Sequence, residues 1–201
     1  MCLYSQQMKT VVKKSRKQQI EEKATTLFQS RGYAATSMRN LAQDLGIEAA
    51  SLYSHIKSKE EILQRICFRM AEEFYSAWQE VDEETGGNAA KMEKAMIAHV
   101  KVITKDTNAS AVFFNEWRHL SEPSLSEFLA MRDDYEGRFK KILRDGMASG
   151  EFKLVDDKFM MLTILSSLNW THNWYKPDGS LSPEEVGKRL SGLLLNGLKN
   201  N

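Results

Sequence analysis

The chain of 201 residues has only three prolines and eleven glycines. Turn-rich β structures use many of both, so their scarcity favours long helices. No run of about 18 apolar residues occurs, and a membrane-spanning helix is therefore not expected. The first residues become basic without an apolar stretch, unlike a secretory signal. We expect a cytoplasmic protein that does not associate with membranes.

Catalytic and metal-binding signatures are also missing. Cys2 and Cys67 are the only cysteines, too few for a disulfide framework or a metal cluster. The four histidines are dispersed, without a His-Glu-x-x-His motif, a glycine-rich phosphate loop or a nucleophile elbow. Glu116 and His119 stand three residues apart, a spacing common in ordinary surface pairs on helices. These absences predict a protein that is not an enzyme and holds no metal or cofactor.

The net charge of +1 conceals an asymmetry along the chain. Residues 1–60 carry ten lysines and arginines against five acidic residues, whereas the remainder carries 18 against 22. A basic N-terminal third on a mildly acidic body indicates that one end meets a polyanion. A solvated helix face can have a similar charge, so this pattern alone does not establish nucleic-acid binding.

Apolar periodicity and capping signals divide the chain into about nine helices and indicate no strand. The segment 16–31 has an amphipathic stripe at Ile20, Ala24, Leu27 and Phe28, and Gly32 ends it. Gly46 and the pair Gly86-Gly87 interrupt the later segments. The expected helices cover residues 16–31, 37–45, 48–53, 59–81, 89–105, 108–119, 124–150, 157–175 and 183–198.

Residues 37–56 fit the stereochemistry of a helix-turn-helix. Gly46 supplies the left-handed residue of the turn, and Ile47 fills the corner between the helices. Leu52 and Ile56 face back toward the first helix. The short second helix then presents small or hydrogen-bonding residues outward, as insertion into a major groove requires. An ordinary helical hairpin fits the pattern alone equally well.

A longer series of residues keeps a fixed order and spacing through this region: Phe28, Gly32-Tyr33, Thr36-Ser37, Leu41-Ala42, Leu45-Gly46-Ile47, Ser51-Leu52-Tyr53, His55 and Ser58-Lys59-Glu60. Over about residues 14–66 this series resembles the N-terminal signature of the tetracycline-repressor (TetR) family. Ala50 and Ile56 depart from the usual glycine and aromatic residue. The resemblance implies an all-α fold with a flexible basic arm (1–13), a three-helix DNA-binding domain (14–60) and a larger helical ligand-binding and dimerisation domain (61–201).

The resemblance and the side-chain chemistry together indicate which residues contact DNA. The first residues of the second helix offer hydroxyl and backbone N–H groups to a phosphate. Tyr53, His55 and Lys59 correspond to family positions that hold phosphates, whereas Ala49 and Ser51 correspond to positions near base edges. The basic arm follows the backbone or a minor groove, unless it is a solubilising tail. The expected DNA-binding residues are Lys14, Arg16, Thr36, Ser37, Arg39, Ala49, Ser51, Tyr53, His55, Lys57 and Lys59.

Aromatic and methionine residues accumulate in the C-terminal two thirds. Most such residues form ordinary core, but their number permits an apolar cavity between helices. The expected ligand-binding residues are Met96, Val100, Phe113, Phe114, Trp117, Arg132, Tyr135, Phe139, Leu165, Trp170 and Trp174.

The segment Asn169-Trp170-Thr171-His172-Asn173-Trp174-Tyr175, continuing to Glu185, is similar to the end of the regulatory domain in TetR-type repressors of fatty-acid and steroid breakdown. Those repressors respond to acyl-CoA thioesters, so the resemblance implies a hydrophobic effector such as an acyl-CoA. Its phosphates need cations, and the helices offer several: Arg118, Arg132, Arg138, Lys140 and Lys141.

The last two long helices are apolar around more than one face, which predicts that a second copy covers them in a homodimer. The expected seam residues are Ile164, Leu168, Leu190, Leu194 and Leu198. Together these features predict a TetR-type repressor that binds a palindromic operator as a dimer and is released by a hydrophobic effector. An activator or a multi-operator regulator also fits. The alternative from another class is a helical ligand-binding or interaction module without DNA-binding activity, which leaves the pattern from Thr36 to Lys59 unexplained.

Overall fold

The computed structural model describes residues 14–198, and this part of the chain is helical without a strand. The all-α prediction is therefore confirmed. The elements are α1 (Arg16–Arg31), α2 (Met38–Asp44), α3 (Ala49–Tyr53), α4 (Lys59–Asp82), α5 (Gly87–Lys105), α6 (Thr107–Glu116), the 3-10 turn η1 (Trp117–His119), α7 (Ser124–Ala148), α8 (Asp157–Asn169), α9 (Thr171–Trp174) and α10 (Pro183–Leu198).

Two of the expected helices differ in detail. The segment predicted as one helix over 157–175 is broken by a turn at Trp170, which separates α8 from the short α9. The segment predicted over 108–119 ends as the 3-10 turn η1, so its last three residues are wound more tightly than the rest.

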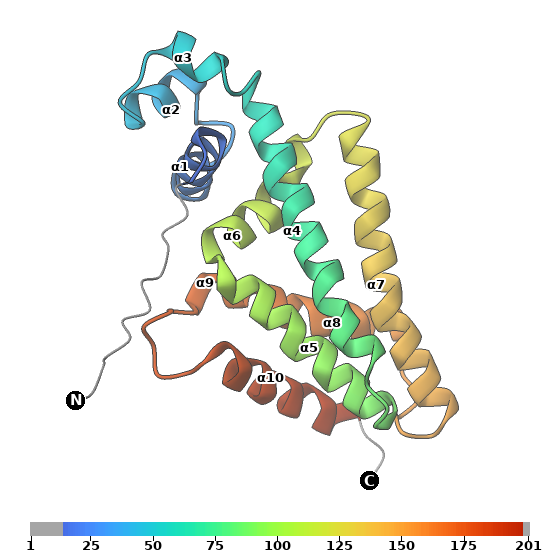
Figure 1. Ribbon diagram of the computed structural model, residues 1–201. Coiled ribbons are helices and arrows are strands. Elements are labelled where there is room, and N and C mark those ends of the chain that lie inside the picture. The colour runs from blue at the N-terminus through green and yellow to red at the C-terminus, as the bar shows by residue number, and fades with distance from the viewer. Residues whose placement is uncertain (1–13, 199–201) are drawn as a thin grey trace, which may run out of the picture.

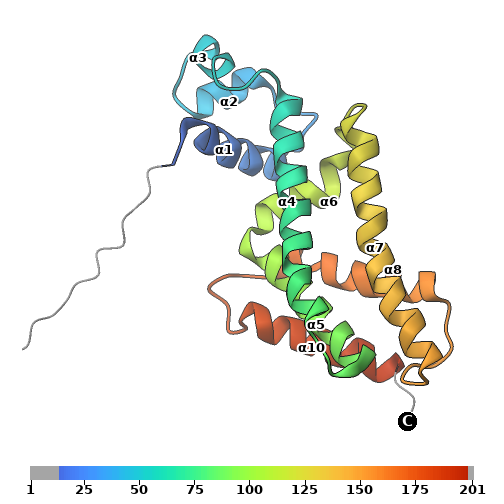
Figure 2. The ribbon, with the colours of Figure 1, turned by 45° about the vertical axis from the view of Figure 1, so that its right-hand side comes forward.

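The helices form a small three-helix group at one end of a larger body. Figure 1 shows α1, α2 and α3 at the upper end of α4, which runs down into the body between α5 and α7. Figure 2 shows α10 lying beneath α5 and α8 crossing behind α7. Helix α5 contacts α4, α7, α8, α9 and α10, and therefore lies at the centre of the body.

The first of two apolar cores joins the three-helix group to the body. It contains Ile20 and Phe28 of α1 together with Ile62, Ile66 and Met70 of α4, all almost fully buried. Val102, Val112 and Phe128 from the body continue the same cluster. The three-helix group therefore packs on the body through a continuous core, because α4 belongs to both.

The second core fills the opposite end of the body. Met92, Met96, Phe139, Leu143 and Met161 from α5, α7 and α8 are buried there, and α10 closes it. Helix α10 approaches α5 closely at Gly187, where an added Cβ would lie 2.9 Å from the Ile97 Cα. A larger residue at this position would separate the two helices.

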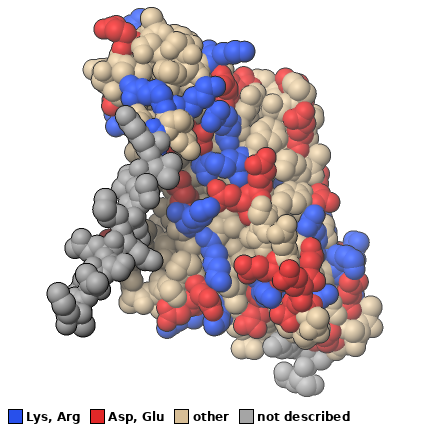
Figure 3. Space-filling view, viewed as in Figure 1, with Lys and Arg blue, Asp and Glu red and all other residues tan. Residues whose placement is uncertain are grey.

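Charge is distributed as the sequence predicts. Figure 3 shows lysine and arginine side chains over the three-helix group, while acidic side chains gather toward the lower end of the body. Among the helices of residues 14–198, none combines the length and the apolar character that a bilayer span requires.

Candidate functional site

Helices α2 and α3 form the predicted helix-turn-helix. Gly46 adopts a left-handed conformation with φ of 64°, and the backbone N–H of Ile47 donates to the Ala42 carbonyl at 3.0 Å, which closes the turn. Leu52 and Ile56 are buried against α1 and α2. The opposite face of α3 is exposed, so the motif presents a free surface at the end of the molecule.

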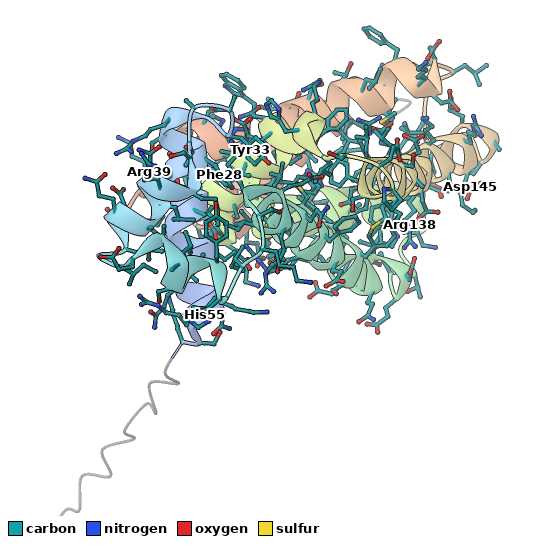
Figure 4. The ribbon with its side chains drawn as sticks, turned by 90° about the horizontal axis from the view of Figure 1, so that it is seen from above. Phe28, Tyr33, Arg39, His55, Arg138 and Asp145 are labelled. Atoms are coloured by element: carbon teal, nitrogen blue, oxygen red, sulfur yellow. The ribbon has the colours of Figure 1, made fainter. Side chains whose placement is uncertain are left out.

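Most of the expected DNA-binding side chains lie on this free surface. Ala49, Ser51 and Tyr53 are exposed along α3, and the Tyr53 side chain is 53% accessible. Figure 4, seen from above, shows Arg39 and His55 at this end of the molecule and Arg138 and Asp145 at the other. The further exposed members of the predicted set are Ser37 and Lys57, and His55 is half-buried.

Thr36 does not present its hydroxyl to solvent, contrary to the prediction. Its side chain is 2% exposed and donates to the Gly32 carbonyl at 2.9 Å, while its backbone N–H donates to the Tyr33 carbonyl. Thr36 therefore holds the loop between α1 and α2 in shape. Ser37 remains exposed and caps α2, since its Oγ accepts from the Asn40 backbone N–H at 3.1 Å.

Lys59 is also occupied within the chain. Its Nζ donates to the Tyr33 carbonyl at 2.7 Å and lies 4.1 Å from the centre of the Tyr33 ring. Burial lowers the pKa of this ammonium, although Glu116 opposes that shift. In this structure the cation ties the α1–α2 loop to the start of α4, and its expected contact with a phosphate stays a prediction.

The basic residues at the start of α1 make weak local contacts. Lys14 Nζ lies 2.7 Å from the Glu22 carboxylate in an exposed pair, and Arg16 donates to the Gln19 amide oxygen at 2.8 Å. Exposed pairs of this kind contribute little to stability, so these basic side chains can readily leave their partners to bind a phosphate. The predicted basic arm over 1–13 lies outside the described residues.

A cavity of about 260 Å³ lies in the body between α4, α5, α6, α7 and α8. Six of the expected ligand-binding residues line it: Phe113, Phe114, Trp117, Arg132, Tyr135 and Leu165. The sequence analysis did not predict that α4 lines the cavity, to which it supplies Ala71, Phe74 and Tyr75. It also missed His99, Phe128, Met131, Glu136 and Asn169, and placed Arg118 only as a candidate cation.

Five expected ligand-binding residues do not line the cavity. Met96, Val100 and Phe139 are fully buried in the second core, because that side of α5 and α7 packs against other helices. Trp170 and Trp174 lie on the surface, 64% and 45% exposed. Helical spacing placed all five on apolar faces but could not tell which apolar face borders a cavity.

Two arginines flank an aromatic wall of the cavity. The Arg118 and Arg132 guanidinium carbons lie 4.6 and 5.0 Å from the Trp117 ring centre. Arg132 Nε is buried and finds no hydrogen-bond partner within residues 14–198, although the Glu136 carboxylate lies 3.7 Å away. An apolar cavity with cations on one wall suits an amphiphile that has an anionic group.

A buried histidine with a strongly shifted pKa lies on the cavity wall. His99 is 3% exposed, and its ring nitrogens lie 2.9 Å from the Tyr135 hydroxyl and 2.8 Å from Asn169 Oδ1. Burial lowers the pKa of His99 to about 4, outweighing the opposite effect of the hydrogen bond to Asn169. The imidazole is therefore neutral at physiological pH.

The expected dimer seam needs correction within its two helices. Ile164, Leu168 and Leu198 are buried inside the chain's own second core, and Leu190 and Leu194 are half-buried against it. The exposed apolar side chains of α8 and α10 are Phe159, Leu162 and Leu193, at 70%, 45% and 76%, and Trp170 directly follows α8. We call these four residues the exposed apolar face.

Two protein families match the chain. The family described as "Tetracyclin repressor-like, C-terminal domain" matches residues 85–198, more than half of the chain. The family described as "Bacterial regulatory proteins, tetR family" matches residues 20–66, the region that contains the helix-turn-helix.

Individual proteins agree with these families. The transcriptional repressor KstR2 of Mycolicibacterium smegmatis is 27% identical over 92% of this chain and 91% of its own length. The crystal structure of the TetR family regulator PfmR of Thermus thermophilus is 34% identical, with a TM-score of 0.78 over 90% of this chain and 99% of PfmR. The fold is also that of AibR in complex with isovaleryl coenzyme A and operator DNA (23% identity; TM-score 0.78; 90% and 98% coverage).

The buried histidine predicts a specific pH dependence of stability. An unfolded chain takes up the His99 proton near pH 6.5, whereas the folded chain resists it until about pH 4. The contribution of neutral His99 to the free energy of unfolding is therefore complete above pH 6.5. It is lost as the pH falls toward 4, with a slope of at most about 1.4 kcal/mol per pH unit. Because glutamine does not titrate, we expect the melting temperature of His99→Gln to depend less on pH between 4 and 6.5 than that of the wild type. His55→Gln is the control, and equal pH profiles for wild type and His99→Gln contradict the prediction.

Proposed function

This chain belongs to the TetR family of bacterial regulators, and from that membership we propose that it is a repressor that binds a palindromic operator as a dimer and leaves it when a hydrophobic effector fills the cavity. The observation that carries the proposal is that α4 connects the two sites. This helix begins beside the helix-turn-helix and supplies Ala71, Phe74 and Tyr75 to the cavity. The relatives are regulators, and we propose no catalysis. A protein that acts on operator DNA is expected in the cytoplasm.

We assign residues 14–60 to DNA binding and residues 61–201 to effector binding and dimerisation. The outward face of α3 supplies base contacts through Ala49 and Ser51, since their side chains are small and exposed. Tyr53, Lys57 and Arg39 surround this face and are available for phosphates. His55 and Ser37 complete the interface, together with Lys14 and Arg16 at the start of α1.

We predict that Tyr53→Ala combined with Lys57→Ala weakens binding to every DNA sequence, because both side chains contact phosphates. Loss of the Lys57 charge should reduce the magnitude of the slope of log affinity against log salt by about 0.9, whereas loss of the uncharged Tyr53 side chain should leave this slope unchanged. Ser51→Ala should instead change the preferred base at one position of each half-site. Fluorescence anisotropy with operator DNA at several salt concentrations measures both effects.

The matched control is Lys141→Ala, which removes a lysine paired with Asp145 at the opposite end of the molecule. It should leave operator affinity unchanged. Full operator affinity in the Tyr53→Ala, Lys57→Ala variant would falsify this interface.

We propose that the exposed apolar face is the dimer seam. Phe159 and Leu162 are three residues apart, and Trp170 follows eight residues after Leu162, so the three form one stripe that continues α8. On α10, Leu193 is exposed beside Gly192, where an added Cβ would meet no atom within 4 Å. Open space next to glycine permits close approach of a helix from a second copy. The family membership identifies that partner as the same chain.

Leu193→Glu should convert the dimer into a monomer, because burying an unpaired carboxylate costs several kcal/mol. Light scattering measures the molar mass of the protein in solution. As the dimer is lost, operator affinity should also fall. Ser76→Glu, on an exposed position of α4, is the control and should remain dimeric. A wild-type monomer, or a Leu193→Glu dimer of unchanged strength, contradicts the seam.

For the effector we propose an acyl-CoA or a related amphiphilic acid. The aromatic walls suit an acyl or ring system, and the guanidinium groups of Arg118 and Arg132 suit the anionic part. AibR shows that the fold can accommodate an acyl-CoA and operator DNA. A switch from mostly bound to mostly released requires about 5.5 kcal/mol of preference for one state. About 220 Å² of apolar contact supplies that amount, which an acyl chain can provide.

The route from cavity to DNA passes through α4 and η1. Trp117 and Arg118 of η1 line the cavity, while the next residue, His119, stacks on Tyr33 with ring centres 4.9 Å apart. Lys59 at the start of α4 holds the Tyr33 carbonyl. A movement of the cavity wall is therefore transmitted to the α1–α2 loop at Tyr33, which contacts both His119 and Lys59.

We predict that palmitoyl-CoA at micromolar concentration changes the tryptophan fluorescence and dissociates the operator complex. Trp117→Phe should abolish most of the fluorescence change, whereas Trp170→Phe, outside the cavity, should retain it. His119→Ala should retain the fluorescence change but release less DNA. If acyl-CoAs and free fatty acids alter neither signal while an unrelated hydrophobic compound does, the acyl-CoA proposal is wrong and the repressor remains.

A further inference from the structure

A chain of three polar side chains crosses one wall of the cavity, among aromatic and apolar residues. His99 comes from α5, Tyr135 from α7 and Asn169 from the last turn of α8, and all three line the cavity. His99 lies in the middle, bonded to the other two at 2.9 and 2.8 Å. Three separate helices therefore bring these groups together.

Packing alone does not require polar groups at this place. The Phe74 ring stacks on His99 with centres 4.6 Å apart, and Phe139 lies beside it at 6.2 Å. In such surroundings a hydrogen-bonded polar network stabilises no better than well-packed apolar side chains, since each group must first lose water. The network therefore calls for another explanation.

The hydrogen-bonding capacity of the three groups is only partly used. Asn169 Oδ1 can only accept, so His99 Nε2 carries the proton and its Nδ1 accepts from the Tyr135 hydroxyl. Two donors on Asn169 Nδ2 and an acceptor lone pair on Tyr135 Oη then have no partner within residues 14–198. A donor on Asn169 and an acceptor on Tyr135 therefore remain available on the cavity wall, one on each side of the His99 ring.

We propose that His99, Tyr135 and Asn169 form a recognition site for a hydroxyl or carbonyl oxygen on the effector. The oxygen accepts from Asn169 Nδ2 or, when it is a hydroxyl, donates to Tyr135 Oη. His99 contacts no ligand atom in this arrangement and holds the other two in orientation. The inference rests on the proposed effector function of the cavity.

The site narrows the class of effector. Arg132 and Tyr135 start from neighbouring turns of α7, but the Arg132 guanidinium lies over Trp117 of η1 whereas the Tyr135 hydroxyl lies at His99 of α5. The anionic group and the second oxygen therefore contact different parts of the cavity. The effector is then an apolar acid, or its thioester, with an oxygen remote from the acid group. A saturated chain that covers the Asn169 amide would displace water from it without offering a hydrogen bond, and the site should discriminate against such a ligand.

A matched pair of ligands tests the inference. Decanoate and 10-hydroxydecanoate differ by one remote oxygen, and 2-hydroxydecanoate carries the same oxygen beside the carboxylate. Titration calorimetry on the full chain should show the 10-hydroxy acid binding about tenfold more tightly than decanoate. The 2-hydroxy acid should show no such gain.

Asn169→Leu should abolish the preference for the 10-hydroxy acid while retaining decanoate affinity. Ser167→Ala, on α8 but outside the cavity lining, is the control and should keep the preference. If Asn169→Leu fails to fold, Tyr135→Phe carries the comparison, because it removes only the hydroxyl and should reduce the preference severalfold.

The outcomes distinguish failure of the oxygen site from failure of the proposed effector-binding function. Equal affinity of wild type for decanoate and 10-hydroxydecanoate, or an unchanged preference in Asn169→Leu, overturns the oxygen site and leaves the effector cavity standing. If neither these acids nor any acyl-CoA binds, the proposed effector function fails and this inference fails with it.

Discussion

The arrangement of this molecule depends on the apolar packing of α4 against α1 at one end and against the body along the rest of its length. Ile62, Ile66 and Met70 are fully buried in a cluster that includes Ile20 and Phe28 of α1. Glu21 of α1 reinforces this contact, since its carboxylate accepts from Arg65 and Arg69 of α4 at 3.2 and 3.0 Å. Because close-packed interiors deform little, the three-helix group and the body cannot shift independently.

This constraint explains how a cavity without DNA contacts can act on DNA. The same helix that packs on α1 presents Phe74 and Tyr75 to the cavity about three turns later. On the other side, η1 places Trp117 against the cavity and His119 against Tyr33. A ligand that favours a different position of either element must alter the orientation of the helix-turn-helix, because no compliant linker separates the two.

Thr36 and Lys59 differ from the other expected DNA-binding residues for one physical reason. Both match the family pattern and carry suitable chemistry, yet both bind the α1–α2 loop, through the Gly32 and Tyr33 carbonyls. A donor that suits a phosphate also suits a backbone carbonyl, and only the folded loop shows which acceptor is within reach. Arg39 and Tyr53 are exposed because helical spacing directs them away from the buried face of the motif, and Lys57 is exposed in the segment before α4.

The sequence by itself determined most of the helices and the turn at Gly46, because these depend on periodicity, capping and side-chain size over short spans. It indicated the family through a resemblance, carried by the series of residues from Phe28 to Glu60. Tertiary structure decided which apolar face meets which partner. Met96, Phe113 and Trp170 all read as candidate ligand contacts, yet they lie in the core, at the cavity and on the surface, respectively. The polar chain of His99, Tyr135 and Asn169 joins residues 36 and 70 positions apart. Periodicity assigns a residue to a face of its own helix, whereas the neighbour of that face depends on how the other helices pack against it.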